Sequence, residues 1–177
     1  MKKLSIYMLE DIEREIEDIA KYDGKEAGIF FSYCRLFFIE RYLGNEYINY
    51  LYNIEFGNIS KEDELKSYEY WKKRLKKNSH EDYSFEDWKS FEVKSYFCNY
   101  VHFHNFLSKN IELYIEYLIS FADGVEIDIL DNLVYEHFQD YDEIDDEEYK
   151  AYKEEVDELY TQLNEIHRKL YNFKKNA

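Results

Sequence analysis

The C-terminal part of the chain carries an uninterrupted heptad pattern of apolar residues. Successive members are separated alternately by three and four residues, as at the a and d positions of a coiled-coil helix. They are Tyr149, Tyr152, Val156, Leu159, Leu163, Ile166, Leu170 and Phe173. At about 1.5 Å of rise per residue the apolar stripe is about 37 Å long. The pattern predicts one long amphipathic helix whose stripe is buried.

The stripe needs a partner, and the first expectation is the aromatic-rich helix predicted at about residues 88–107 of the same chain, packed antiparallel. The alternative is a homodimer through the C-terminal helix. An isolated, solvated helix is the weakest interpretation, because it would leave the stripe in water.

The rest of the chain is also typical of helices. It has no proline and only five glycines, and apolar residues recur at spacings of three and four. We therefore predict an all-α protein, a single-domain bundle of about seven to eight helices spanning residues 1–177. The expected helices cover about 5–22, 25–43, 46–56, 61–75, 85–108, 111–122, 129–138 and the heptad segment, with 125–129 as an extended link.

Polar residues mark the expected helix starts. Ser60 and Ser84 each precede an Asp by three residues, as in a capping box, and Asn45 and Asn110 are placed as N-caps. Segment 25–43 is apolar almost all round, which predicts a buried central helix.

Composition favours a folded protein outside the membrane. Aromatic residues make up 20% of the chain, which supplies ample surface to bury, and no segment is long and apolar enough for a bilayer span. No secretory signal follows Met1, and Cys34 and Cys98 are too few for a disulfide framework. We expect a cytoplasmic protein, in the host cell cytoplasm if it is phage-encoded.

Negative charge is concentrated in one region. Residues 110–160 hold 18 acids and two bases, whereas acids and bases balance over the rest of a chain with net charge −16. Residues 140–158 alone carry 11 acids and two lysines. As one helix, this segment would carry one net charge per ~3.2 Å, close to the ~3.4 Å per phosphate of a nucleic-acid strand. A solvated helix face is the simpler interpretation.

This charge distribution, without a recognisable catalytic motif, predicts a non-enzymatic acidic inhibitor that binds the basic nucleic-acid channel of a partner enzyme. Its small size and acidity resemble those of phage-encoded anti-CRISPR proteins, which implies a counter-defence role; toxin immunity is a related expectation. The partner would be a basic nucleic-acid-binding protein or nuclease, with no direct nucleic-acid or membrane binding. The expected partner-binding residues are Asp140, Asp142, Glu143, Asp145, Asp146, Glu147, Glu148, Glu154, Glu155, Asp157 and Glu158.

Two other functions remain open. The first is a helical adaptor or oligomerising subunit that uses the heptads. The second is an enzyme: Arg74 and His80 resemble the arginine and histidine pair of helical ribonuclease domains carried by prokaryotic nucleotide-binding systems, although Leu75 replaces the usual polar residue. The resemblance implies that His80 would transfer protons and that Arg74 would stabilise the scissile phosphate.

Metal and cofactor binding are not expected. Cys98 and His102 stand four residues apart and could share one helix face, but packing roles explain them equally well. A calcium loop from Asp140 would need Gly and Glu at positions that hold Asp145 and Ala151.

Overall fold

The computed structural model describes residues 4–21, 27–75, 83–130 and 146–176. Every regular element in these ranges is helical, so the predicted all-α class with a long C-terminal helix is confirmed. The described residues group into two compact units, Met1–Arg35 with Leu107–Ala177, and Leu36–Phe106. Each unit is described below by itself, and a single domain over 1–177 stays a prediction.

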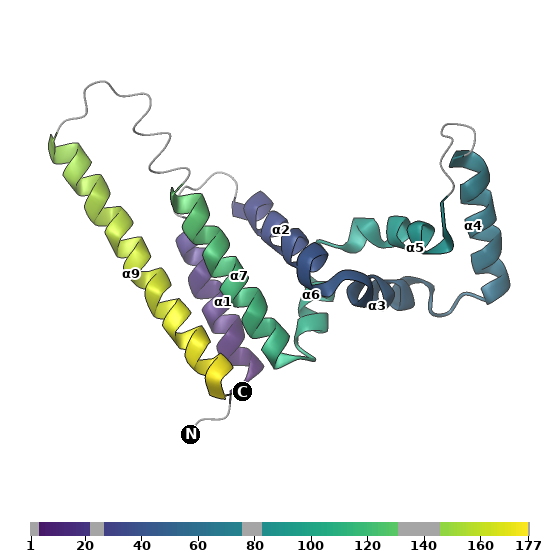
Figure 1. Ribbon diagram of the computed structural model, residues 1–177, viewed down its shortest axis with the longest axis horizontal. Helices are drawn as coiled ribbons and strands as arrows, with labels where there is room; N and C mark the ends of the chain where they lie inside the picture. Colours follow the sequence, from purple (N-terminus) through teal and green to yellow (C-terminus); the bar gives the residue numbers. More distant parts are fainter. Residues whose placement is uncertain (1–3, 22–26, 76–82, 131–145, 177) are drawn as a thin grey trace. The chain divides into compact units, whose positions relative to one another are not determined.

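The first unit contains α1 (Ile6–Ala20), the start of α2 (Ala27–Phe38), α7 (Ile111–Ile129) and α9 (Asp146–Asn176). Figure 1 shows α1, α7 and α9 side by side. α7 is the most buried of these helices: it contacts both α1 and α9 extensively, whereas the contact between α1 and α9 is smaller. Its apolar residues therefore form the centre of this unit.

The apolar stripe of α9 is buried within the same chain. Leu159, Leu163, Ile166 and Leu170 are all buried, as the heptad pattern predicts. Their partners are α7 and α1, so the predicted packing against residues 88–107 is wrong. The reason is that α1 and α7 already present two apolar faces, and α9 covers both. Tyr149 and Tyr152 have side chains outside the described part.

Ion pairs fix the direction of α9 against α7. Lys174 pairs with Glu116, and His167 lies beside Asp123, so residue numbers fall along one helix as they rise along the other. The two helices are antiparallel, as Figure 1 also shows.

A carboxylate is buried between α1 and α7. Glu13 is 2% exposed, and it accepts hydrogen bonds from the hydroxyls of Tyr114 at 2.7 Å and Tyr117 at 3.3 Å. Burial, and then the negative charge of Glu13, raise the pKa of Tyr117 well above 10.0. Buried Arg35 partly opposes this shift. The network satisfies polar groups that would otherwise be costly to bury.

α7 continues through Asp123 and Gly124, where the sequence predicts a helix end and an extended link over 125–129. That prediction is wrong, because Val125 and Ile129 are buried on the helix. A Cβ atom at position 124 would stand 3.2 Å from the Sγ of Cys34. The glycine therefore permits close approach of α2, and packing outweighs its helix penalty of about 1 kcal/mol. The helix predicted at 129–138 lies mostly outside the described residues.

The second unit contains the end of α2, a π-helical turn η2 (Ile39–Leu43), α3 (Gly44–Phe56), α4 (Lys61–Leu75), α5 (Phe85–Val93), a 3-10 turn η3 (Lys94–Tyr96) and α6 (Tyr100–Leu107). Aromatic side chains dominate its core. Tyr47 contacts Phe97, Phe103 and Phe106, and Trp88 packs against Tyr52.

The single helix predicted over 85–108 is wrong, since α5, η3 and α6 replace it. The side chain of Asn99 accepts a hydrogen bond of 3.1 Å from the backbone N–H of His102, which caps a new helix. This cap explains why the chain breaks there.

Segment 25–43 also differs from its prediction. Phe31, Phe38 and Ile39 are buried, but Ile29 and Phe37 are about half exposed, so the helix is not buried all round. At its end the π-helical turn leads directly into α3. Gly44 has φ of +48°, and Leu43 rather than Asn45 occupies the N-cap position.

The other predicted helix starts are confirmed. Ser84 and Asp87 form a complete capping box, the Ser60 Oγ accepts from the Asp63 N–H at 3.2 Å, and the Asn110 Oδ1 accepts from the Leu113 N–H at 3.2 Å. Within the described ranges, no helix combines the length and the apolar character that crossing a bilayer requires.

Candidate acidic interface on helices 1 and 9

Part of the predicted acidic surface lies on α9. Glu147, Glu154, Glu155, Asp157 and Glu158 are exposed on this helix. Asp146 and Glu148 belong to α9 with side chains outside the described part. Asp140, Asp142, Glu143 and Asp145 lie outside the described residues altogether. The structure therefore places five of the eleven predicted side chains.

Helical spacing brings three of these carboxylates onto one face. Glu147, Glu154 and Glu158 are separated by seven and four residues, whereas Glu155 and Asp157 point to its two flanks. The stripe continues to Glu165, seven residues further on, which is also exposed. Glu165 was not among the predicted residues, although it continues the steps of seven and four residues that place the other three glutamates on one helix face.

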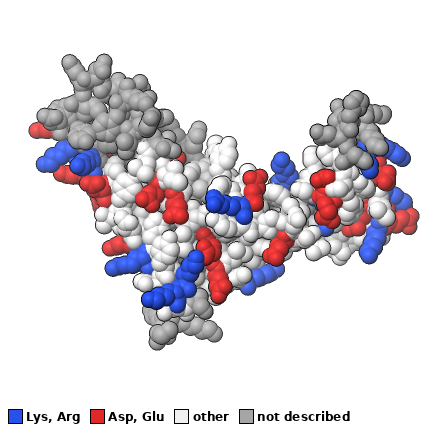
Figure 2. All heavy atoms as spheres, in the orientation of Figure 1, with Lys and Arg blue, Asp and Glu red and all other residues white. Residues whose placement is uncertain are grey.

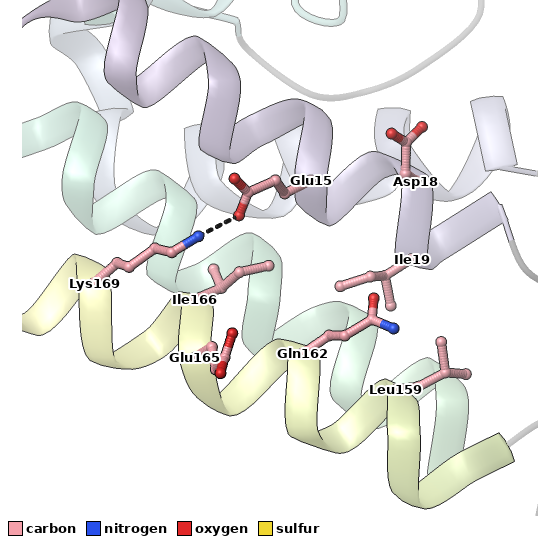
Figure 3. A pocket seen from close by; sticks show the side chains of 8 residues that line it. All are labelled: Glu15, Asp18, Ile19, Leu159, Gln162, Glu165, Ile166 and Lys169. Carbon is pink, nitrogen blue, oxygen red and sulfur yellow. Dashed lines mark hydrogen bonds and ion pairs between the residues drawn. The ribbon is translucent and has the colours of Figure 1, made fainter.

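The same face of α9 borders a groove shared with α1 (Figure 3). The groove has a volume of about 410 Å³. Its polar lining comes from Glu15 and Asp18 on α1 and from Gln162, Glu165 and Lys169 on α9. Its apolar lining comes from Ile19, Leu159 and Ile166. The structure therefore adds α1 acids that the sequence analysis missed.

The groove's charge is only partly neutralised. Lys169 Nζ lies 2.7 Å from Glu15 Oε2 across the groove, and Lys21 Nζ lies 3.4 Å from Asp18 Oδ1. By contrast, Glu158 and Glu165 have no cationic partner within the described part of the chain. These two carboxylates lie seven residues, or about two helical turns, apart on this face.

Bases elsewhere moderate the acidic character. Lys150 Nζ lies 4.0 Å from Glu154 Oε1, an exposed pair of the kind that contributes less than about 1 kcal/mol. Figure 2 shows carboxylates and basic side chains interspersed on the face in view. The acidic feature is therefore a stripe beside a groove, and not a continuous surface of one sign.

The spacing of the stripe differs from that of a phosphate backbone. Steps of seven and four residues correspond to about 10 Å and 6 Å along the axis, compared with about 3.4 Å per phosphate in one strand of a duplex. The stripe can attract lysine and arginine side chains, but it does not reproduce phosphates one for one.

A structural role explains part of the same pattern. Asp146, Glu147 and Glu148 in the first turn of α9 and Lys174 and Lys175 in its last turn all complement the helix dipole. This arrangement stabilises the helix whether or not a partner binds.

The second unit contains a different cleft, which includes Arg74. The cleft has a volume of about 420 Å³ and is lined by Tyr70, Trp71 and Trp88 among others. The Arg74 guanidinium lies 6.0 Å from the centre of the Tyr70 ring. His80 lies outside the described residues, so the structure does not show whether it joins Arg74.

The Cys98 and His102 pair does not share a helix. Cys98 lies in the turn before α6, and His102 lies within α6. The ring of His102 packs 6.3 Å from that of Tyr96, which fits the packing role. The sequence argument for two ligands on one helix face is therefore wrong, because the helix begins after Cys98.

Comparison with known proteins adds no further constraint. No family model matches the chain, and neither a curated protein nor a solved structure shows significant similarity to it.

Proposed function

We propose that this protein is a non-enzymatic acidic binding protein that docks on a basic surface of a nucleic-acid-binding partner and inhibits it. The observation that carries the proposal is the stripe of Glu147, Glu154, Glu158 and Glu165 along one exposed face of α9. Segregation of the net charge of −16 into residues 110–160 supports it.

The mechanism is electrostatic. A cleft that holds phosphates with lysine and arginine also attracts carboxylates, and the field of a segregated acidic region accelerates encounter. Packing of α9 on α1 and α7 holds the stripe straight, so less side-chain and backbone freedom is lost on binding. The groove beside α1 offers apolar contact for the stems of basic side chains.

Charge reversal on the stripe tests the proposal. The quadruple variant Glu147→Lys, Glu154→Lys, Glu158→Lys and Glu165→Lys should lose capture of the partner from host extract, and wild-type capture should weaken steeply between low and high salt. Circular dichroism should show the helical content of the wild type, because all four side chains are exposed.

A matched control uses exposed acids of the second unit. Glu55→Lys, Glu62→Lys, Glu69→Lys and Glu86→Lys make the same charge change away from α9 and should leave capture intact. If both quadruple variants lose the partner equally, net charge rather than the stripe mediates binding. Retention of the partner by the stripe variant would instead favour the adaptor alternative.

A further inference from the structure

Three side chains of types that can bind a metal lie close together on the side of α9 opposite the acidic stripe. Asp123 and Glu126, one turn apart on α7, lie beside His167 of α9. One ligand atom from each lies within 4.8 Å of the other two. The cluster joins the central helix of the unit to the C-terminal helix, and it is separate from the acidic groove.

The imidazole of His167 points a buried nitrogen at this cluster. Its Nε2 atom lies 3.0 Å from Asp123 Oδ1, but the atom makes no hydrogen bond to any group in the described part of the chain. The His167 side chain is 15% exposed and that of Asp123 is 54% exposed. The ring nitrogen therefore has a carboxylate oxygen at ion-pair distance but no hydrogen bond, at a site that opens to solvent on the carboxylate side.

The 3.0 Å separation is close to that of two ligands of one ion. Ligands of a tetrahedral zinc ion at about 2.0–2.1 Å are about 3.3–3.4 Å apart, so the two atoms would separate by a few tenths of an ångström on binding. A carboxylate oxygen beside an imidazole nitrogen, but off its hydrogen-bonding direction, has this relationship. The third candidate ligand is a carboxylate oxygen of Glu126, which lies within 4.8 Å of the other two atoms.

A second polar group is buried beside the cluster without a partner. Tyr160 stands seven residues before His167 on α9, on the same face, and its hydroxyl makes no hydrogen bond within the described residues. A phenol in this position is suited to donate to a carboxylate that binds a metal.

The two carboxylates could accept a cation. Neither Asp123 nor Glu126 pairs with a lysine or arginine in the ranges that the structure describes, and the basic group beside Asp123 is the imidazole of His167. One imidazole with two carboxylates is the donor set that zinc and neighbouring first-row ions accept, whereas magnesium and calcium prefer oxygen alone.

We propose that Asp123, Glu126 and His167 form a binding site for a divalent transition-metal ion of the zinc type, with water completing the coordination. A bound ion would clamp α9 to α7 at the middle of their contact. The site does not depend on the proposed function, because its residues lie away from the stripe.

The test uses the full chain after chelator treatment, titrated with Zn²⁺ by calorimetry. We expect one saturable site and a rise in melting temperature, since an ion that binds the folded state stabilises it. His167→Ala and Asp123→Asn should each weaken affinity at least tenfold, within the range typical when a ligand or its support is lost. Co²⁺ should give a visible absorption spectrum that both variants lose.

The matched control is Glu116→Gln, which removes another α7 carboxylate that faces α9 but has Lys174 as its partner. It should leave Zn²⁺ affinity unchanged. Asp123→Asn tests the site even if His167→Ala is unstable, because Asp123 is largely exposed. Zn²⁺ binding that is absent, or that survives Asp123→Asn undiminished in a folded protein, would overturn the proposal.

Discussion

The carboxylate of Glu13 on α1 accepts a 2.7 Å hydrogen bond from the hydroxyl of Tyr114 on α7, 101 residues later in the chain. Tyr117, one turn further along α7, donates to the other oxygen of the same carboxylate. All three side chains are buried. A shift of α1 by one turn would break both of these hydrogen bonds, so the buried carboxylate favours the observed register of α1 against α7.

Loss of this acceptor should destabilise the first unit. Glu13→Ala would remove the acceptor of two buried hydrogen bonds, and we expect a loss of about 2–4 kcal/mol in the free energy of unfolding. Glu13→Gln keeps an acceptor oxygen and should cost less. Urea denaturation followed by circular dichroism measures both.

Asp18→Ala serves as the control on the same helix. Asp18 is 76% exposed, so its removal should change the free energy of unfolding by less than about 0.5 kcal/mol. A Glu13→Ala variant as stable as Asp18→Ala would show that the buried network contributes nothing.

The N-terminus of α5 should make stability depend on pH. Hydrogen bonds from the side chain and then the backbone of Ser84 lower the pKa of Asp87 below 3.8. A carboxylate whose pKa is lower in the folded state stabilises that state above its unfolded pKa, and the contribution disappears as pH falls through the folded pKa. Wild type should therefore exceed Asp87→Asn in stability at neutral pH, and the difference should vanish in acid.

Tryptophan fluorescence can follow this effect, because both tryptophans, Trp71 and Trp88, lie in the second unit. Glu86→Gln is the control: Glu86 is also in the first turn of α5 but has no part in the capping box. An Asp87→Asn deficit that stays constant from neutral to acidic pH would contradict the capping explanation.

Local signals predicted much of the fold, and long-range packing decided the rest. The Ser84 and Asn110 caps and the α9 stripe depend on residues within one or two turns of each other, and the sequence shows them directly. The helix end predicted at Gly124 was wrong, because this glycine makes room for the Cys34 side chain of α2, which lies far away in the sequence. The choice of α1 and α7 as partners for α9 likewise depends on contacts that no local pattern encodes.

The candidate sites divide in the same way. Glu147, Glu154 and Glu158 were predicted because acids crowd that segment, and their common face follows from helix periodicity. Asp123 and His167 were not predicted as a cluster, since 44 positions separate them and only the antiparallel packing of α7 and α9 brings them together.

Cys34 should be an unreactive thiol in the folded protein. Burial, and then the charge of Asp128, raise its pKa to about 12, although Arg35 partly offsets the shift. Both thiols are partly buried, and the thiolate is the reactive form, so the raised pKa of Cys34 should make iodoacetamide label it more slowly than Cys98 at neutral pH. Mass spectrometry of the digested protein measures the two rates.

Two comparisons identify the cause of this protection. In concentrated urea both cysteines should react at similar rates, because unfolding removes the burial. Asp128→Asn removes the second contribution only, so Cys34 should react somewhat faster than in wild type while remaining slower than Cys98. Equal labelling of Cys34 and Cys98 in the native protein would mean that α2 separates readily from α7. In the structure the two helices are close at this point, since a Cβ atom at position 124 would lie 3.2 Å from Cys34 Sγ.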